Sequence, residues 1–208
     1  MSRSLRSVDL VRVPKRKRHI RKILIVCEGE KTEPAYFKKF PEKPEVFDVL
    51  DVKGIGNNTI FVVNKAIELR DKAEKDGEPY IEAWAVFDKD DFLQENFEKA
   101  INLAAENRIN CAYSIECFEL WYLLHFNYYD TGMHRNDYFE KLSQLLKQPY
   151  AKNSDNMYNF LKDKTNIAIK NARKLYLKQY TQPLSEQNPV TLVFELVEKL
   201  KGLFDSLY

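Results

Sequence analysis

Two short apolar runs that each end in carboxylates constrain the fold of this chain most. Residues 23–27 read Ile-Leu-Ile-Val-Cys, and Glu28 follows them directly. A second run, residues 84–87, is followed by Asp88-Lys89-Asp90-Asp91. Continuous apolar runs of this length predict strands buried on both faces, as in a parallel sheet. Because ligand sites in open α/β sheets lie at the carboxyl ends of the strands, we expect these acids to share one edge.

Strand and helix patterns alternate along the first part of the chain and become helical after Cys117. The apolar patterns and turn residues predict strands over 23–27, 46–52, 81–87 and 109–115, and helices from 32 to 40, from 59 to about 75, and over 92–108, 117–126, 135–147, 156–180 and 189–203. A break is expected in the long helix near Lys164-Thr165. This alternation favours an α/β protein with a mainly parallel sheet, flanking helices and a C-terminal helical part.

Composition excludes several classes of protein. No apolar stretch approaches the roughly 20 residues of a membrane helix, and no apolar signal segment lies near Met1. Three scattered cysteines give neither a disulfide framework nor the ligand spacing of zinc. The chain also lacks a Walker phosphate loop, Gly-x-Gly-x-x-Gly and Gly-x-Ser-x-Gly. We therefore expect a cytoplasmic protein with no membrane partner.

The net charge of +2 conceals a strong segregation of charge. Residues 1–22 hold nine Lys or Arg and one acid, so the remaining residues are net acidic. Residues 1–21 are predicted to form a basic N-terminal arm, and its side chains Lys15, Arg16, Lys17 and Arg18 are candidates to contact nucleic-acid phosphates. A solvated leader, or one that docks on the chain's own acidic surface, explains the same composition.

The acids themselves suggest a cation site. Asp88 and Asp90 are two residues apart, so both carboxylates point the same way if the strand continues. They could then share one hard cation, with Glu28 completing its ligands. A divalent cation of this kind supports phosphoryl chemistry, in which Glu28 is also a candidate general acid or base. Each motif alone is more typical of a polar turn at a helix N-terminus, but both at one sheet edge favour the cation site.

The order of these motifs resembles that of RloB-like proteins, small bacterial proteins of the TOPRIM type related to OLD nucleases. The resemblance spans roughly residues 20–203 and rests on four segments: Ile25-Val26-Cys27-Glu28-Gly29-Glu30-Lys31-Thr32-Glu33-Pro34, Phe87-Asp88-Lys89-Asp90-Asp91-Phe92, Cys117-Phe118-Glu119-Leu120-Trp121-Tyr122-Leu123-Leu124-His125-Phe126 and Asn188-Pro189.

The resemblance implies a TOPRIM or Rossmann-like core over 22–126, with a helical part over 127–208 packed on it. It also implies that Glu28, Asp88 and Asp90 bind Mg²⁺ or Mn²⁺ and cleave phosphodiesters of RNA or DNA. Association with phage defence, and with a partner protein such as an ATPase, follows from the resemblance alone. Two other functions stay open: a nucleic-acid- or effector-binding module that keeps the cation site, and nucleotidyl transfer.

Several further residues are candidates near this site. Glu119 interrupts an apolar helix, and a buried carboxylate needs a partner; it is interpreted either as a further metal ligand beside the acids or as part of an ion pair with Lys31 or Arg108. Asp91 is a second additional ligand candidate. Glu30, Lys31, Glu33 and His125 are candidates for supporting roles. The position of Glu33 in the first turn of a helix already accounts for its charge. For His125, a place in the hydrophobic core is a better explanation than a role as a metal ligand.

The segment 147–180 combines basic and aromatic side chains. Lys170, Arg173, Lys174 and Lys178 lie near one face of the predicted helix and are candidates to follow a phosphate backbone, with tyrosines available to stack on unpaired bases. A basic stripe is more often a solvated face, and tyrosines at helical spacing are more often core residues.

Overall fold

The computed structural model describes residues 22–39, 47–51, 59–89, 94–152, 154 and 156–205. The elements, in chain order, are β1 (Ile23–Cys27), α1 (Thr32–Lys39), β2 (Phe47–Asp51), α2 (Thr59–Lys75), β3 (Glu82–Lys89), α3 (Gln94–Glu106), β4 (Asn110–Ile115), α4 (Glu119–Leu124), α5 (Arg135–Leu146), α6 (Met157–Leu161), η2 (Lys162–Lys164), α7 (Thr165–Gln179), β5 (Val190–Thr191) and α8 (Val193–Asp205). This confirms the predicted α/β class and its C-terminal helical part, with the break in the long helix at η2.

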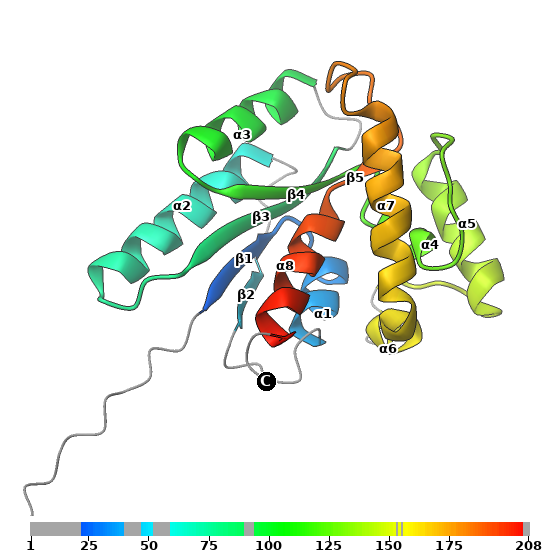
Figure 1. Cartoon of the computed structure of the whole chain (residues 1–208), viewed down its shortest axis with the longest axis horizontal. Helices are drawn as coiled ribbons and strands as arrows, with labels where there is room; N and C mark the ends of the chain where they lie inside the picture. The colour runs from blue at the N-terminus through cyan, green and yellow to red at the C-terminus, as the bar shows by residue number, and fades with distance from the viewer. Residues whose placement is uncertain are drawn as a thin grey trace, which may run out of the picture.

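One sheet with the strand order β2-β1-β3-β4-β5 organises the molecule (Figure 1). Strands β2, β1, β3 and β4 are parallel, with Cys27 paired to both Asp51 and Val86. Only β5 is antiparallel among the described strands, and its Thr191 pairs with Ser114 of β4. The sequence pattern had predicted helix from residue 189, and the two-residue strand β5 corrects that prediction.

Two hydrophobic layers cover the faces of the sheet, as the alternation of side chains along a strand requires. Along β1, Ile23, Ile25 and Cys27 belong to the layer that also contains residues of α1, α4, α7 and α8. Leu24 and Val26 belong to the opposite layer, which contains residues of α2 and α3. Figure 1 shows α2 and α3 on one side of the sheet and α1 and α8 on the other. The central strands are thus buried on both faces, as their continuous apolar runs predicted.

Candidate functional site

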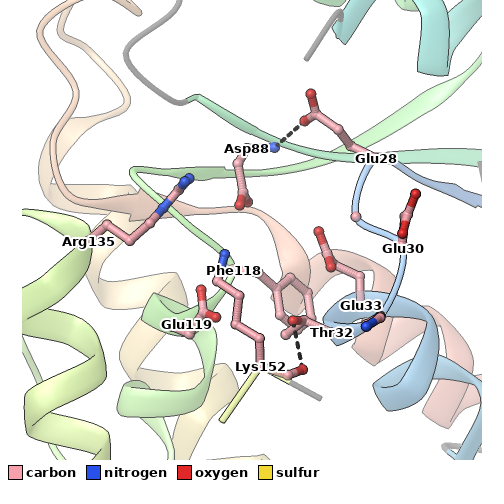
Figure 2. A pocket seen from close by; sticks show the side chains of 11 residues that line it. Glu28, Glu30, Thr32, Glu33, Asp88, Phe118, Glu119, Arg135 and Lys152 are labelled. Atoms are coloured by element: carbon pink, nitrogen blue, oxygen red, sulfur yellow. Dashed lines mark hydrogen bonds between the residues drawn. The ribbon is translucent and has the colours of Figure 1, made fainter. Parts of the chain in front are cut away.

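A pocket of about 280 Å³ lies where β1 and β3 end. Five acidic side chains and three basic ones line it together with Gly29, Thr32 and Phe118: Glu28, Glu30, Glu33, Asp88 and Glu119 against Lys31, Arg135 and Lys152 (Figure 2). Two of these acids, Glu28 and Asp88, lie at the edge of the sheet that the sequence predicted. When all eight are ionised the lining carries a net charge of −2, so the pocket attracts cations but also contains groups that can bind an anion.

Asp88 brings a carboxylate from the end of β3 into the pocket. The preceding residues Val86 and Phe87 face opposite layers of the core, and alternation places Asp88 on the same side as Val86. That is the side of α1 and α4. In Figure 2 the Asp88 carboxylate points into the pocket, toward Glu119 and Lys152.

Glu28 lies at the same edge, but its carboxylate is directed differently. Its backbone N–H donates to the Val86 carbonyl at 2.8 Å, which extends the parallel ladder by one residue. Its Oε2 accepts a hydrogen bond from the backbone N–H of Asp88 at 3.1 Å. Since Cys27 faces the α1 and α4 side, alternation turns Glu28 to the other side of the sheet. Glu28 and Asp88 are therefore neighbours whose carboxylates point to different sides.

Glu33 fills the space above Gly29. A Cβ at Gly29 would lie 2.6 Å from Glu33 Oε1, so a larger residue here would require the Glu33 carboxylate to move. Gly77, and not Gly29, is the glycine with a positive φ among the described residues. Burial raises the pKa of Glu33 to about 7; a backbone hydrogen bond and Lys152 oppose this rise, and the charges of Glu119 and Glu28 increase it.

Glu119 begins α4 and is only 2% exposed. Its Oε1 accepts a hydrogen bond from the Tyr150 hydroxyl at 2.8 Å, and burial together with the Glu119 charge raises the pKa of that tyrosine. A phenol is thus one hydrogen-bond partner of this buried acid, and Cys117 is another. Arg108, one of the cations that the sequence suggested, lies beside a different pocket, at the start of β3. Lys31, the other cation that the sequence suggested, lines the same pocket as Glu119 and the other acids.

Sequence reasoning missed Arg135 and Lys152. Arg135 is the first residue of α5, and Lys152 follows that helix in a segment tied to α1 by a hydrogen bond from Thr32 Oγ1 to the Lys152 carbonyl at 3.1 Å. Neither residue stands in an apolar pattern or a motif, and only the tertiary fold brings them to the acids. One signal could have pointed to Arg135, namely its position at the start of the predicted helix 135–147.

His125 lies outside the pocket. It is completely buried, and its Nδ1 is 2.9 Å from the Trp121 carbonyl. Burial lowers the pKa of His125 to about 4, so the ring is neutral at physiological pH. The structure places this residue in the core against the Trp121 ring, the position that the simpler interpretation of the sequence assigned to it.

The donor chemistry of the pocket fits a hard divalent cation, because its acidic residues all offer carboxylate oxygens. In the part of the chain that the structure describes, however, no three His, Cys, Asp or Glu side chains are grouped so as to hold a metal ion. Asp90 and Asp91, two of the predicted ligands, lie outside the described residues. The described acids supply at most part of the predicted cation site in this arrangement.

Comparison with known families assigns the chain. A family model described as RloB-like protein matches residues 23–200. The chain belongs to the RloB-like family. No curated protein and no solved structure matches the sequence. The matched residues of this RloB-like protein include Glu28, Asp88, Glu119, Arg135 and Lys152.

The α7 residues predicted to contact nucleic acid are not part of the pocket lining of this RloB-like protein. On α7, Arg173 pairs with Glu198, Lys174 lies 4.0 Å from the centre of the Tyr128 ring, and Lys178 Nζ is 2.9 Å from Asp130 Oδ2. Lys170 is exposed on the same helix. The arm residues Lys15, Arg16, Lys17 and Arg18 lie outside the described residues. Within the described part of the chain, no helix combines the length and apolar character of a membrane span.

Proposed function

We propose that this RloB-like protein is a divalent-cation-dependent nuclease that hydrolyses phosphodiesters of nucleic acid in the pocket at the ends of β1 and β3, as part of bacterial phage defence. The observation that carries the proposal is the joint lining of one pocket by acids from β1, β3, α1 and α4 and by two cations from the helical part. Phosphoryl transfer needs both kinds of group, because acids hold a cation and basic groups neutralise phosphate oxygens.

Three of the acids that line the pocket have a role in this proposal. Asp88 and Glu119 offer carboxylates to Mg²⁺ or Mn²⁺, and Asp90 is the candidate third ligand. When bound, such a cation neutralises phosphate charge and lowers the pKa of a water molecule. Glu28 accepts the backbone N–H of Asp88 and so holds the end of β3 in place. The assignment to TOPRIM-type nucleases, and the link to phage defence, rest on the resemblance in sequence.

A second candidate is a binding module that keeps the fold without catalysis. The observation in its favour is that the Glu28 carboxylate bonds to the Asp88 backbone and that the described acids do not gather into a three-ligand cluster. In such a module the pocket would hold a nucleic acid or a small effector, with a cation serving structure or regulation.

Cleavage and binding assays separate the two candidates. Purified full-length protein is incubated with single- and double-stranded DNA and RNA in Mg²⁺ or Mn²⁺, beside Asp88→Asn, Asp90→Asn and Glu119→Gln. Each substitution should lower the cleavage rate by more than about 100-fold, beyond the 10–100-fold effects of groups that only orient a ligand. Glu140→Gln is the control, because Glu140 is exposed on α5 away from the pocket. Binding that survives without any cleavage would overturn the nuclease and favour the module.

A further inference from the structure

We propose that Arg135 and Lys152 form a phosphate-binding half of the pocket that holds the sugar–phosphate backbone of the substrate and leaves its base unread. This inference rests on the proposed function, since it concerns the same pocket, and it extends that function by naming what the site recognises. The expected ligand class is any nucleotide unit that carries a phosphate, whatever its base.

The two cations reach the pocket from one connected stretch of chain. Arg135 opens α5, and the segment after α5 returns to the site, where Lys152 Nζ lies 5.2 Å from the centre of the Phe139 ring of that helix. Hydrogen bonds from the Tyr150 hydroxyl to Glu119 and from Thr32 to the Lys152 carbonyl hold the segment at the pocket. Figure 2 shows both side chains extending toward the Asp88 carboxylate.

The charges that line the pocket suggest a role for Arg135 and Lys152 other than packing in the hydrophobic core. A phosphate approaching Asp88 and Glu119 alone would be repelled, whereas a guanidinium offers parallel N–H donors to two phosphate oxygens and an ammonium adds a point charge. The acids of the pocket thus suit a cation, and Arg135 and Lys152, which lie among these acids, suit the anion that the cation accompanies. Placing both beside Asp88 brings the phosphate next to the predicted cation.

The described lining offers a base no aromatic ring face on which to stack. Phe118 is the one aromatic residue among the described lining residues, and it is 1% exposed. Its ring is packed edge-on against Tyr36, Phe37 and Tyr122, so it does not offer the ring face on which single-strand binders stack a base. The volume of about 280 Å³ lies just below the range of roughly 300–1,000 Å³ typical of small-molecule sites. A phosphate and its sugar suit such a space better than a whole nucleotide with its base.

Mononucleotide binding tests the inference without any need for cleavage. The probes are inorganic phosphate and the 5′-monophosphates of adenosine, cytidine, guanosine and uridine, titrated in Mg²⁺ into the full-length protein and followed by NMR. We expect the four nucleotides to bind within about threefold of one another. Arg135→Gln and Lys152→Gln should each weaken binding about tenfold or more, in line with the removal of a charge-assisted hydrogen bond.

Lys141→Gln is the matched control, because Lys141 is a cation of α5 that lies over the Tyr129 ring outside the pocket; it should bind the probes like the wild type. Thermal unfolding of each variant verifies its fold, and the half-site is rejected if folded Arg135→Gln and Lys152→Gln both bind phosphate normally. A difference above tenfold among the four nucleotides would overturn the claim that the base is unread. If the protein cleaves nucleic acid but binds phosphate equally well without Arg135 and Lys152, the nuclease proposal holds and this half-site is rejected. If phosphate binding depends on both residues but the protein cleaves no nucleic acid, the half-site holds and the nuclease proposal is rejected.

Discussion

At the pocket, the fold changes the pKa of the Glu33 carboxyl strongly. Its side chain is 5% exposed and lies over Gly29, at the start of α1. Burial raises the pKa of this carboxyl to about 7, so near neutral pH the protein holds a substantial fraction of it protonated. An acid placed at the first turn of a helix is ordinarily explained by the helix dipole. At Glu33 the loss of solvent raises the pKa by more than the helix dipole lowers it.

Replacing Glu33 by Gln should stabilise the protein in a pH-dependent manner. The folded pKa of Glu33, about 7, exceeds the ordinary value of 4.5, so the folded state binds the proton more tightly and loses stability as pH rises from 4.5 to 7. Gln mimics the protonated form and removes this loss, which amounts to about 3 kcal/mol. Urea unfolding at pH 4.5 and pH 8 measures it: Glu33→Gln should gain stability over the wild type only at the higher pH. Glu30→Gln, at an exposed neighbouring position, should show no such gain; an equal response in both variants would contradict the assignment.

Single residues also show which parts of the site the sequence could reveal. Glu28 and Asp88 were predicted at one sheet edge because each follows a buried apolar run, and the structure places them there. Their different directions follow from strand alternation, since Glu28 succeeds Cys27 and Asp88 succeeds Phe87, which face opposite layers. Arg135 and Lys152 could not be found in this way, because a basic residue in a polar segment carries no local sign of its tertiary neighbours.

At the scale of elements, residues 147–152, which follow α5, pack across the site and are called the strap here. Tyr150 connects it to α4 through the Glu119 carboxyl and to α5 through a bond from its backbone N–H to Ser143 Oγ at 2.9 Å. Its ring packs between those of Tyr122 and Phe139. The strap therefore supports both the buried acid of α4 and the cation Lys152.

Tyr150→Phe should destabilise the protein by about 2 kcal/mol, because it leaves the buried Glu119 carboxyl without this donor while keeping the ring. Chemical denaturation at neutral pH provides the measurement. Tyr180→Phe removes a hydroxyl from a side chain that is 54% exposed near the end of α7, and its effect should stay within about 0.5 kcal/mol. If Tyr150→Phe unfolds at the same urea concentration as the wild type, the strap does not depend on this bond.

Helices and strands were predicted well where a local sequence pattern was long, and were missed where pairing with a distant strand decided the structure. The apolar run 23–27 and the helices with clear breakers, such as α2 before Asp76-Gly77, were predicted almost to the residue. Strand β5 was missed because two residues, Val190 and Thr191, give no period. They become a strand only through β4, where Thr191 Oγ1 lies 2.9 Å from Ser114 Oγ. No local propensity encodes an interaction between residues so far apart in sequence.

At the scale of the whole molecule, opposite charges are segregated along the chain. Residues 1–22 carry a net charge of +8 and the remaining residues −6, which together give the overall +2. The pocket adds to the acidic part, and three of the four α7 cations already interact with groups of their own chain. The basic arm is therefore the strongest remaining source of long-range attraction for a polyanion.

Removing the charge of the arm should change nucleic-acid binding more than removing that of α7. A variant with Lys15, Arg16, Lys17 and Arg18 replaced by Gln should bind DNA or RNA more weakly, and its plot of log affinity against log salt should be less steep by roughly 0.7–0.9 for each phosphate that the arm no longer neutralises. The matched variant carries four Gln in place of Lys170, Arg173, Lys174 and Lys178. It should keep most of the salt dependence, because Glu198, Tyr128 and Asp130 already engage three of these cations and leave them less free to neutralise phosphates. Fluorescence anisotropy with a labelled oligonucleotide between about 50 and 200 mM salt compares the two, and equal slopes in the wild type and the arm variant would exclude a phosphate-contacting arm.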